Sequence, residues 1–148
     1  MVTLYTIGFT KKSAEKFFTL LQNNNVKKIV DIRINNTSQL AGFAKGSDLA
    51  YFVKAICDIN YVHIPDFAPT KELLSDYQKE IVNWTQYQVV YKKLLQQRNI
   101  LSRYKIDNFD GACFLCSEDT PEQCHRRLLV EYLKNKHPEL EIKIIHLK

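Results

Sequence analysis

The 148-residue sequence has no long hydrophobic run, because its apolar stretches extend over only a few residues, too few to cross a bilayer. It also has no internal repeat, no low-complexity segment and no stretch whose composition predicts disorder. The first residues are typical of a strand followed by a turn, without the pattern of a secretory signal. We therefore expect a single domain over residues 1–148, in the cytoplasm and without membrane contact.

Cysteine is too scarce, at four residues, to require a disulfide scaffold in a chain of this length. Cys57 lies in an apolar helical pattern and is predicted to be a small buried side chain. The excess of basic residues is modest, 21 against 16 acidic ones, and it favours anionic partners without singling out nucleic acid. The expected partner is thus a small anionic ligand or a nucleic acid, and no oligomeric state is predicted.

Strands and helices are predicted to alternate along the chain. Near-continuous apolar runs indicate strands at 3–7, 28–32, 61–64, 112–116 and 142–147, the last of which could pair in either direction. Helical patterns follow Ser13, which is placed to cap the first helix, and span about 47–60 and 120–135. This order predicts an α/β three-layer sandwich with a mainly parallel five-stranded sheet and helices on both faces.

The segment 66–107 is too long for a single crossover helix and is predicted to be a helical insert. Thr70 and Thr85 could each cap a helix, the second of which would carry Val89 and Val90 on its apolar side. The insert is rich in aromatic residues, including Trp84. These either cover one face of the sheet or form a lid or partner surface.

Charged and small residues follow two predicted strands at the edge where parallel sheets bind ligands. Gly8 ends the first strand and lets backbone approach closely. Asp31 and Arg33 share one face at the end of the second strand, where a charged pair is costly unless the two are paired or used. The long loop after them includes Ser38 and Lys45, and we expect both to contribute to anion binding.

Most of the candidate reactive residues lie in one stretch, CFLCSEDTPEQCHRR, residues 113–127, which combines cysteines, acidic residues, a histidine and two arginines. A capping box over 120–123 predicts a helix that begins at Thr120. Cys116 and Glu118 at the strand end would then meet Cys124, His125 and Arg126 near the helix start. The helix dipole there favours an anion and favours the thiolate form of a nearby cysteine.

Several interpretations of this stretch stay open. Cys113, Cys116, Cys124 and His125 have the composition of a zinc site, but two cysteines three apart on a strand point to opposite faces, and neighbours in a helix diverge. Cys116 and Cys124 could instead form a redox disulfide. An anion pocket with a thiol, and with Glu118 or His125 as acid or base, is the preferred interpretation. A purely structural cluster is the fourth.

The chain resembles the domain-of-unknown-function family 488. The motifs that carry the resemblance are Tyr5–Gly8, Asp31–Arg33, Ser38, Phe43, Tyr61–Pro65, Ala68–Lys71, Cys116-x-Glu118 and Cys124–Arg126. The resemblance implies an α/β sandwich with these motifs at one edge of the sheet, and it implies no particular reaction. Many relatives have Leu-Gly-Gly after the third strand, where this chain has a variant loop from Asp66 to Thr70.

The sequence thus favours an enzyme for an anionic substrate, with nucleotides or nucleic acid included, and without a metal or other cofactor. Gly8, Arg33, Ser38, Lys45 and Arg126 are the predicted binding residues. Cys116 or Cys124 would be the nucleophile or redox thiol, and Glu118, His125 or Asp31 would handle protons. A non-catalytic binding module and a thiol redox sensor are the alternatives.

Overall fold

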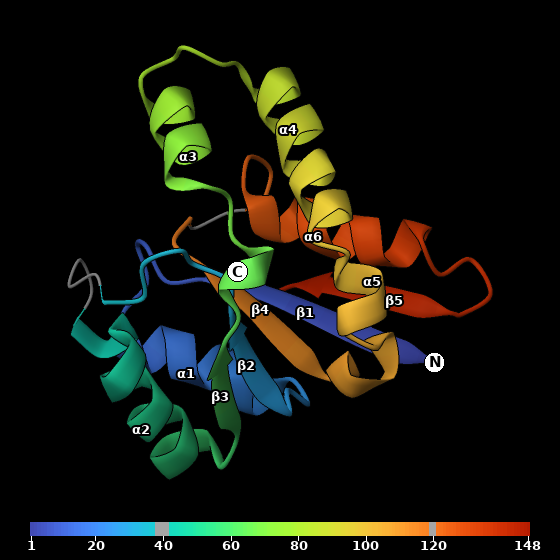
Figure 1. Ribbon diagram of the computed structural model, residues 1–148. Helices are drawn as coiled ribbons and strands as arrows, with labels where there is room; N and C mark the ends of the chain where they lie inside the picture. The colour runs from blue at the N-terminus through green and yellow to red at the C-terminus, as the bar shows by residue number, and fades with distance from the viewer. Residues whose placement is uncertain (38–41, 119–120) are drawn as a thin grey trace.

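The computed structural model describes residues 1–37, 42–118 and 121–148 (Figure 1). Its five strands form one sheet in the order β3-β2-β4-β1-β5, and every neighbouring pair is parallel. The strands are β1 (Val2–Gly8), β2 (Lys28–Asp31), β3 (Asn60–His63), β4 (Ala112–Cys116) and β5 (Ile142–His146). The predicted α/β fold is confirmed, and the last strand, whose direction was open, is also parallel.

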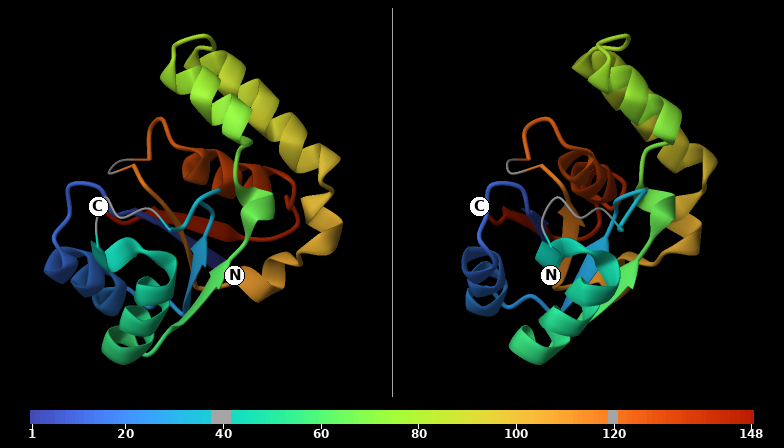
Figure 2. Two further views of the ribbon diagram at one scale, coloured as in Figure 1. Left: turned by 60° about the vertical axis from the view of Figure 1, so that its left-hand side comes forward. Right: turned by 90° about the vertical axis from the view of Figure 1, so that its left-hand side faces the viewer.

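The sheet lies between two helical layers (Figure 2). Helices α1 (Ala14–Asn23) and α2 (Gly46–Cys57) cover one face, and α4 (Trp84–Gln97) and α6 (His125–Asn135) cover the other. Successive strand residues point to opposite faces, so Phe114 packs in the α4–α6 core whereas Cys113 and Leu115 pack in the α1–α2 core. The predicted three-layer sandwich is therefore confirmed.

The helical insert is present between β3 and β4. It consists of α3 (Lys71–Gln78), α4 and α5 (Ile100–Arg103), flanked by the short 3₁₀ turns η2 (Pro65–Phe67) and η3 (Ile106–Phe109). A third 3₁₀ turn, η1 (Gly42–Ala44), precedes α2. Helices α3 and α4 lie side by side and extend beyond the sheet (Figures 1 and 2). Within the described ranges, no helix is both long and apolar enough to cross a bilayer.

Two of the predicted helix caps are correct and one is wrong. The hydroxyls of Ser13 and Thr70 accept hydrogen bonds from the backbone N–H groups of Lys16 and Leu73, as expected. Helix α4, in contrast, begins two residues before Thr85 would cap it. Asn83 and Gln86 form a reciprocal capping box, which satisfies two backbone N–H groups instead of one.

The buried face of α4 also differs from the predicted one. Tyr87, Tyr91 and Leu95 form its inner face, and Val89 and Val90 are exposed. The base of the insert is held to the body by hydrogen bonds, since the Tyr91 hydroxyl donates to the Phe67 carbonyl and the Arg98 guanidinium donates to the carbonyls of Asp66 and Ala68. The aromatic residues of the insert thus partly serve as core.

The predicted start of the last helix is also wrong. Helix α6 begins at His125, with Cys124 in an extended conformation as its N-cap, and it ends at Asn135 as expected. The proposed cap Thr120 lies outside the described residues. Residues 121–124 form turns, so Cys124 and His125 do not follow each other around a helix. The predicted divergence of their side chains therefore does not apply.

Chain direction creates a crevice at the carboxyl ends of the central strands. After β1 and β2 the chain passes to the α1–α2 layer, whereas after β4, which lies between them, it passes to the α6 layer. Neighbouring strands whose connections leave on opposite faces form a topological switch point, where open parallel sheets bind ligands. The candidate site lies here.

Candidate functional site

A cavity of about 490 Å³ opens at the switch point. One side is formed by the strand-end loops and the start of α6, and the other side is formed by α3 and α4 of the insert. The residues from the first side are Thr10, Arg33, Ile34, Asn35, Cys116, Ser117, Glu118, Gln123, Cys124 and His125; those from the insert side are Pro69, Leu74, Tyr77, Gln78, Trp84 and Tyr87. The volume lies within the range of small-molecule sites.

Cys116 and Cys124 form a disulfide in the wall of this cavity. The Arg126 guanidinium lies fully buried behind them, and its Nη1 is 3.4 Å from the Cys116 Sγ and 3.5 Å from the Cys124 Sγ. Cys124 is also the N-cap of the 11-residue helix α6. After reduction, both the guanidinium and the helix dipole would stabilise negative charge on these sulfurs.

The other two cysteines lie away from the cavity. Cys113 packs in the core on the opposite face of the sheet, as predicted, and Cys57 lies on α2. Burial raises the pKa of both thiols. The four residues with the composition of a zinc site are therefore not brought together. Among the described residues, Cys116, Cys124 and His125 have donor atoms within 4.8 Å of one another, and this trio could hold a metal ion only once the disulfide is reduced.

His125 is held in one tautomer by the backbone. Its Nε2 lies 3.0 Å from the Ile32 carbonyl oxygen, which only accepts, so Nε2 carries the proton and Nδ1 carries the lone pair. Burial lowers the pKa of His125 to about 4, against a smaller opposite effect of this hydrogen bond. The ring is therefore neutral at pH 7 and is a poor proton donor there.

The lowered pKa of His125 predicts acid sensitivity. Between about pH 6.5 and pH 4 the unfolded chain binds a proton at this ring that the folded protein does not bind, so stability falls as the pH falls through this window. From pH 7 to pH 5 we expect wild type to lose roughly 2 kcal/mol more of its free energy of unfolding than His125→Gln does. Urea denaturation of both proteins at the two pH values measures this; equal losses would contradict it.

Asp31 and Arg33 form a buried ion pair. Arg33 Nε and Nη2 donate to the two carboxylate oxygens at 2.9 and 2.7 Å, and Nη2 also donates to the Ala44 carbonyl at 2.7 Å. The Tyr61 hydroxyl donates to the second Asp31 oxygen, and burial followed by this bond raises the pKa of Tyr61. Asp31 is thus fully engaged in orienting Arg33 and is poorly placed to move protons.

One guanidinium nitrogen of Arg33, Nη1, takes part in none of these hydrogen bonds. The side chain is only 4% exposed and lines the cavity, and Nη1 has no hydrogen-bond partner among the described residues. A buried guanidinium N–H without an acceptor is costly, because its hydrogen bonds to water are lost. An anionic ligand in the cavity would satisfy it.

Glu118 ends the strand-end loop with its side chain exposed at the cavity. Its carbonyl oxygen accepts from Arg126 Nη1, and Ser117 is held through its own carbonyl by the backbone and hydroxyl of Thr10. Gly8, the strand partner of Cys116, allows this loop to lie against β1. A Cβ at Gly8 would overlap the Glu118 carbonyl and lie 2.9 Å from Arg126 Nη1.

We expect Gly8→Ala to displace this loop. The added methyl group meets backbone, which cannot rotate away, so the free energy of unfolding should fall by about 1–3 kcal/mol. Gly42→Ala is the matched control, since a Cβ there meets nothing within 4 Å. Urea denaturation measures both variants, and similar values for the two would show that the loop adapts without cost.

The structure brings most of the predicted site residues together. Arg33, Cys116, Glu118, Cys124 and His125 line one cavity, with Gly8, Asp31 and Arg126 directly behind them. Lys45 is the N-cap of α2 and does not line the cavity, and Ser38 lies outside the described residues.

Sequence reasoning missed several contributors. Tyr61 was part of a predicted strand and of a motif that carries the family resemblance, but it was not among the predicted site residues, and nothing in its local pattern indicates that it would reach Asp31. Thr10, which links the loops after β1 and β4, was not predicted to contribute to the site. The aromatic composition of the insert was the one available signal for Tyr77 and Trp84.

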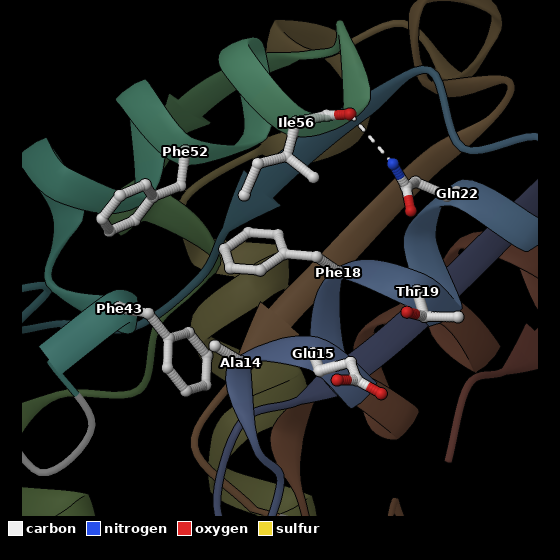
Figure 3. Close-up of a pocket in the computed structure, with 8 residues that line it drawn as sticks. All are labelled: Ala14, Glu15, Phe18, Thr19, Gln22, Phe43, Phe52 and Ile56. Atoms are coloured by element: carbon white, nitrogen blue, oxygen red, sulfur yellow. Dashed lines mark hydrogen bonds between the residues drawn. The ribbon is translucent and has the colours of Figure 1, made fainter.

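A second hollow, of about 370 Å³, lies between α1 and α2 (Figure 3). Phe18, Phe43, Phe52 and Ile56 form most of its wall, and the Gln22 amide donates to the Ile56 carbonyl at its rim. Among the described residues that line it, Glu15 is the one titratable group. The cavity at the switch point is lined by more charged and nucleophilic side chains, including Arg33, Glu118 and Cys124.

Comparison with known proteins gives one match. A family model described as a domain of unknown function, DUF488, matches residues 13–133. No curated protein and no solved structure matches the chain. The matched range includes every residue described above as lining the cavity at the switch point except Thr10.

Proposed function

The chain belongs to the DUF488 family, whose function is unknown, and we propose that it is an enzyme that acts on an anionic substrate at the switch-point cavity. Cys124 is the reacting group in this proposal, Arg33 binds the anion, and Glu118 handles protons. The observation that carries it is the convergence of a cysteine pair and an unsatisfied, buried arginine nitrogen on one cavity. Recognition alone has no need for the two sulfurs.

The reaction class is group transfer through sulfur. In the reduced protein the Cys124 thiolate forms a bond to an electrophilic group of the substrate, while the bond to the leaving group breaks. The leaving group departs with the bonding electron pair and takes a proton from Glu118. A water molecule then gives its hydroxyl to the transferred group and a proton to Glu118, and the sulfur leaves as thiolate. Atoms and electrons balance, with water as the co-reactant.

Glu118 is proposed as the acid–base group because the other two candidates, His125 and Asp31, are already engaged in hydrogen bonds. His125 is neutral and donates its one N–H to Ile32, and the Asp31 oxygens accept from Arg33 and Tyr61. The Glu118 carboxyl is exposed at the cavity and is accessible to water there. General acid–base catalysis needs a group within reach of the leaving atom, which this position offers.

The proposal is tested by anion protection. The reduced protein is alkylated with iodoacetamide at pH 6.5, with and without phosphate or sulfate, and each cysteine is followed by mass spectrometry. We expect Cys124 to react fastest and the anion to slow it at least about fivefold, with the protection lost in Arg33→Gln. Cys57 and Cys113 are internal controls, since burial raises the pKa of both. A slow Cys124, or protection that persists in Arg33→Gln, would overturn the proposal.

A redox-controlled protein is the second candidate, and the Cys116–Cys124 disulfide favours it. Formation of this bond removes two electrons and two protons, which an oxidant such as peroxide accepts, and it leaves no thiolate for catalysis. Both proposals need reduced thiols to begin with, in keeping with the cytoplasmic location expected from the sequence.

The disulfide predicts a dependence on reductant. Alkylation of Cys124 should be absent after mild peroxide treatment and should return fully with dithiothreitol. Peptide mapping of the oxidised protein should identify Cys116 linked to Cys124. In Cys116→Ser, peptide mapping after peroxide treatment should no longer find Cys124 in this disulfide. A Cys124 that stays equally reactive after oxidation would argue against any redox role.

A further inference from the structure

We propose that the substrate is a nucleoside phosphate, with its base against the aromatic wall of the cavity and its phosphate at Arg33. This inference rests on the proposed function and names the substrate class of the same site. The aromatic wall is defined here as Tyr77, Trp84 and Tyr87, which all line the cavity from the insert.

The three rings of the aromatic wall pack against one another. The Trp84 and Tyr87 rings are stacked at 5.1 Å and 18°, and the Tyr77 ring lies 5.7 Å from Trp84 and 5.1 Å from Tyr87. Tyr87 is buried and supports the other two, which stay partly exposed. Partly exposed rings that pack against one another offer flat apolar surface to a planar ligand, and bases gain affinity on such surfaces. The Arg127 guanidinium, 6.0 Å from the centre of the Trp84 ring, adds positive charge beside this surface.

The opposite side of the cavity suits the phosphate. Arg33 lines that side; its Nη1 is buried without a hydrogen-bond partner among the described residues, and its other nitrogens are fixed by Asp31 and Ala44. A guanidinium held in this way binds phosphate without losing side-chain freedom. The start of α6 adds positive potential at the same side.

Side-chain amides lie on both sides of the cavity. Asn35, Gln78 and Gln123 line the cavity, and Gln123 Oε1 accepts from the Tyr77 hydroxyl at 3.1 Å. Amides carry both donors and acceptors, which match the hydrogen-bonding edge of a base. A carboxylate or a bare phosphate would use Arg33 alone and would leave both the amides and the rings without a role.

The single tryptophan makes the test direct, because Trp84 is the only source of indole fluorescence in the chain. AMP, ribose 5-phosphate, adenosine and inorganic phosphate are titrated into the reduced 148-residue protein, with Trp84 emission and protection of Cys124 from alkylation as readouts. We expect AMP to quench Trp84 and to bind at least about tenfold more tightly than ribose 5-phosphate or adenosine. A 5′-phosphorylated oligonucleotide that binds more tightly still would identify the nucleoside phosphate as the end of a strand.

Tyr77→Leu removes a ring and keeps apolar bulk. It should weaken the binding of AMP about tenfold and leave the affinity for ribose 5-phosphate unchanged. Tyr51→Leu, on the exposed side of α2, should change neither affinity. Equal protection of Cys124 by AMP and ribose 5-phosphate would overturn the substrate class and leave the proposed function standing. An unreactive Cys124 with no protection by any anion would overturn the proposed function itself.

Discussion

Cys124→Ser should abolish the fast alkylation of the reduced protein at pH 6.5. An ordinary thiol is only about 1% ionised at that pH, so the loss of a thiolate stabilised by Arg126 and the α6 dipole should lower the rate by roughly ten- to a hundredfold. Once a substrate is known, turnover should fall on the order of 1,000-fold or more, because serine is a far weaker nucleophile. Site-resolved mass spectrometry measures the first effect.

Cys116→Ser is the matched control for this experiment. It also prevents the disulfide, but it keeps the sulfur at the helix start, so the fast reaction of Cys124 should remain. Both variants should unfold at urea concentrations close to that of wild type after reduction. If the fast reaction instead followed Cys116, the two cysteines would exchange roles and the helix start would not be what activates the thiol.

Asp31→Asn should be, together with Arg33→Gln, among the most destabilising of the changes considered. Both members of the Asp31–Arg33 pair are less than 5% exposed, and the substitution leaves the guanidinium buried without a counter-charge. Removal of one partner of such a pair costs about 3–5 kcal/mol of the free energy of unfolding. Urea denaturation measures it, and anion protection of Cys124 should be lost in any protein that remains folded, since Arg33 is no longer held.

Two controls separate burial from charge. Asp58→Asn breaks the exposed Lys54–Asp58 pair on α2 and should cost less than about 1 kcal/mol. The double variant Asp31→Leu/Arg33→Met replaces the whole pair with apolar groups and should recover much of the stability lost in Asp31→Asn. A double variant as unstable as the single one would mean that the Tyr61 and Ala44 contacts, not the ion pair, stabilise this edge.

Periodicity predicted the sheet well, because buried parallel strands need apolar residues on both faces and little else. The residues that end β1, β2 and β4 could therefore be placed at one edge from the sequence. Helix starts were harder. The capping box over 120–123 is a valid local signal, yet the turns over 121–124 replace it and move the start of α6 to His125.

The later start of α6 determines which side chains meet at the cavity. With Cys124 inside a helix, its sulfur and the His125 ring would diverge, whereas as N-cap it meets Cys116 and His125 within 4.8 Å. Tyr61 shows another limit, since its bond to Asp31 depends on the register of β2 and β3, which pairs Asp31 with His63 and which no local pattern encodes. The second half of the cavity, formed by α3 and α4, depends on tertiary packing alone.

The insert is anchored at its base through Tyr91 and Arg98, and its outer part extends past the sheet with the aromatic wall. Under the proposed function, the insert would determine which ligand binds and the strand ends would determine the reaction, so the two properties would reside in separable parts of the chain. Substitutions in α3 and α4 could change which ligand is accepted while the strand ends keep the same sulfur and arginine chemistry. Evolution, or protein engineering, could therefore diversify relatives of this fold through the insert alone, without passing through variants that have lost the reaction.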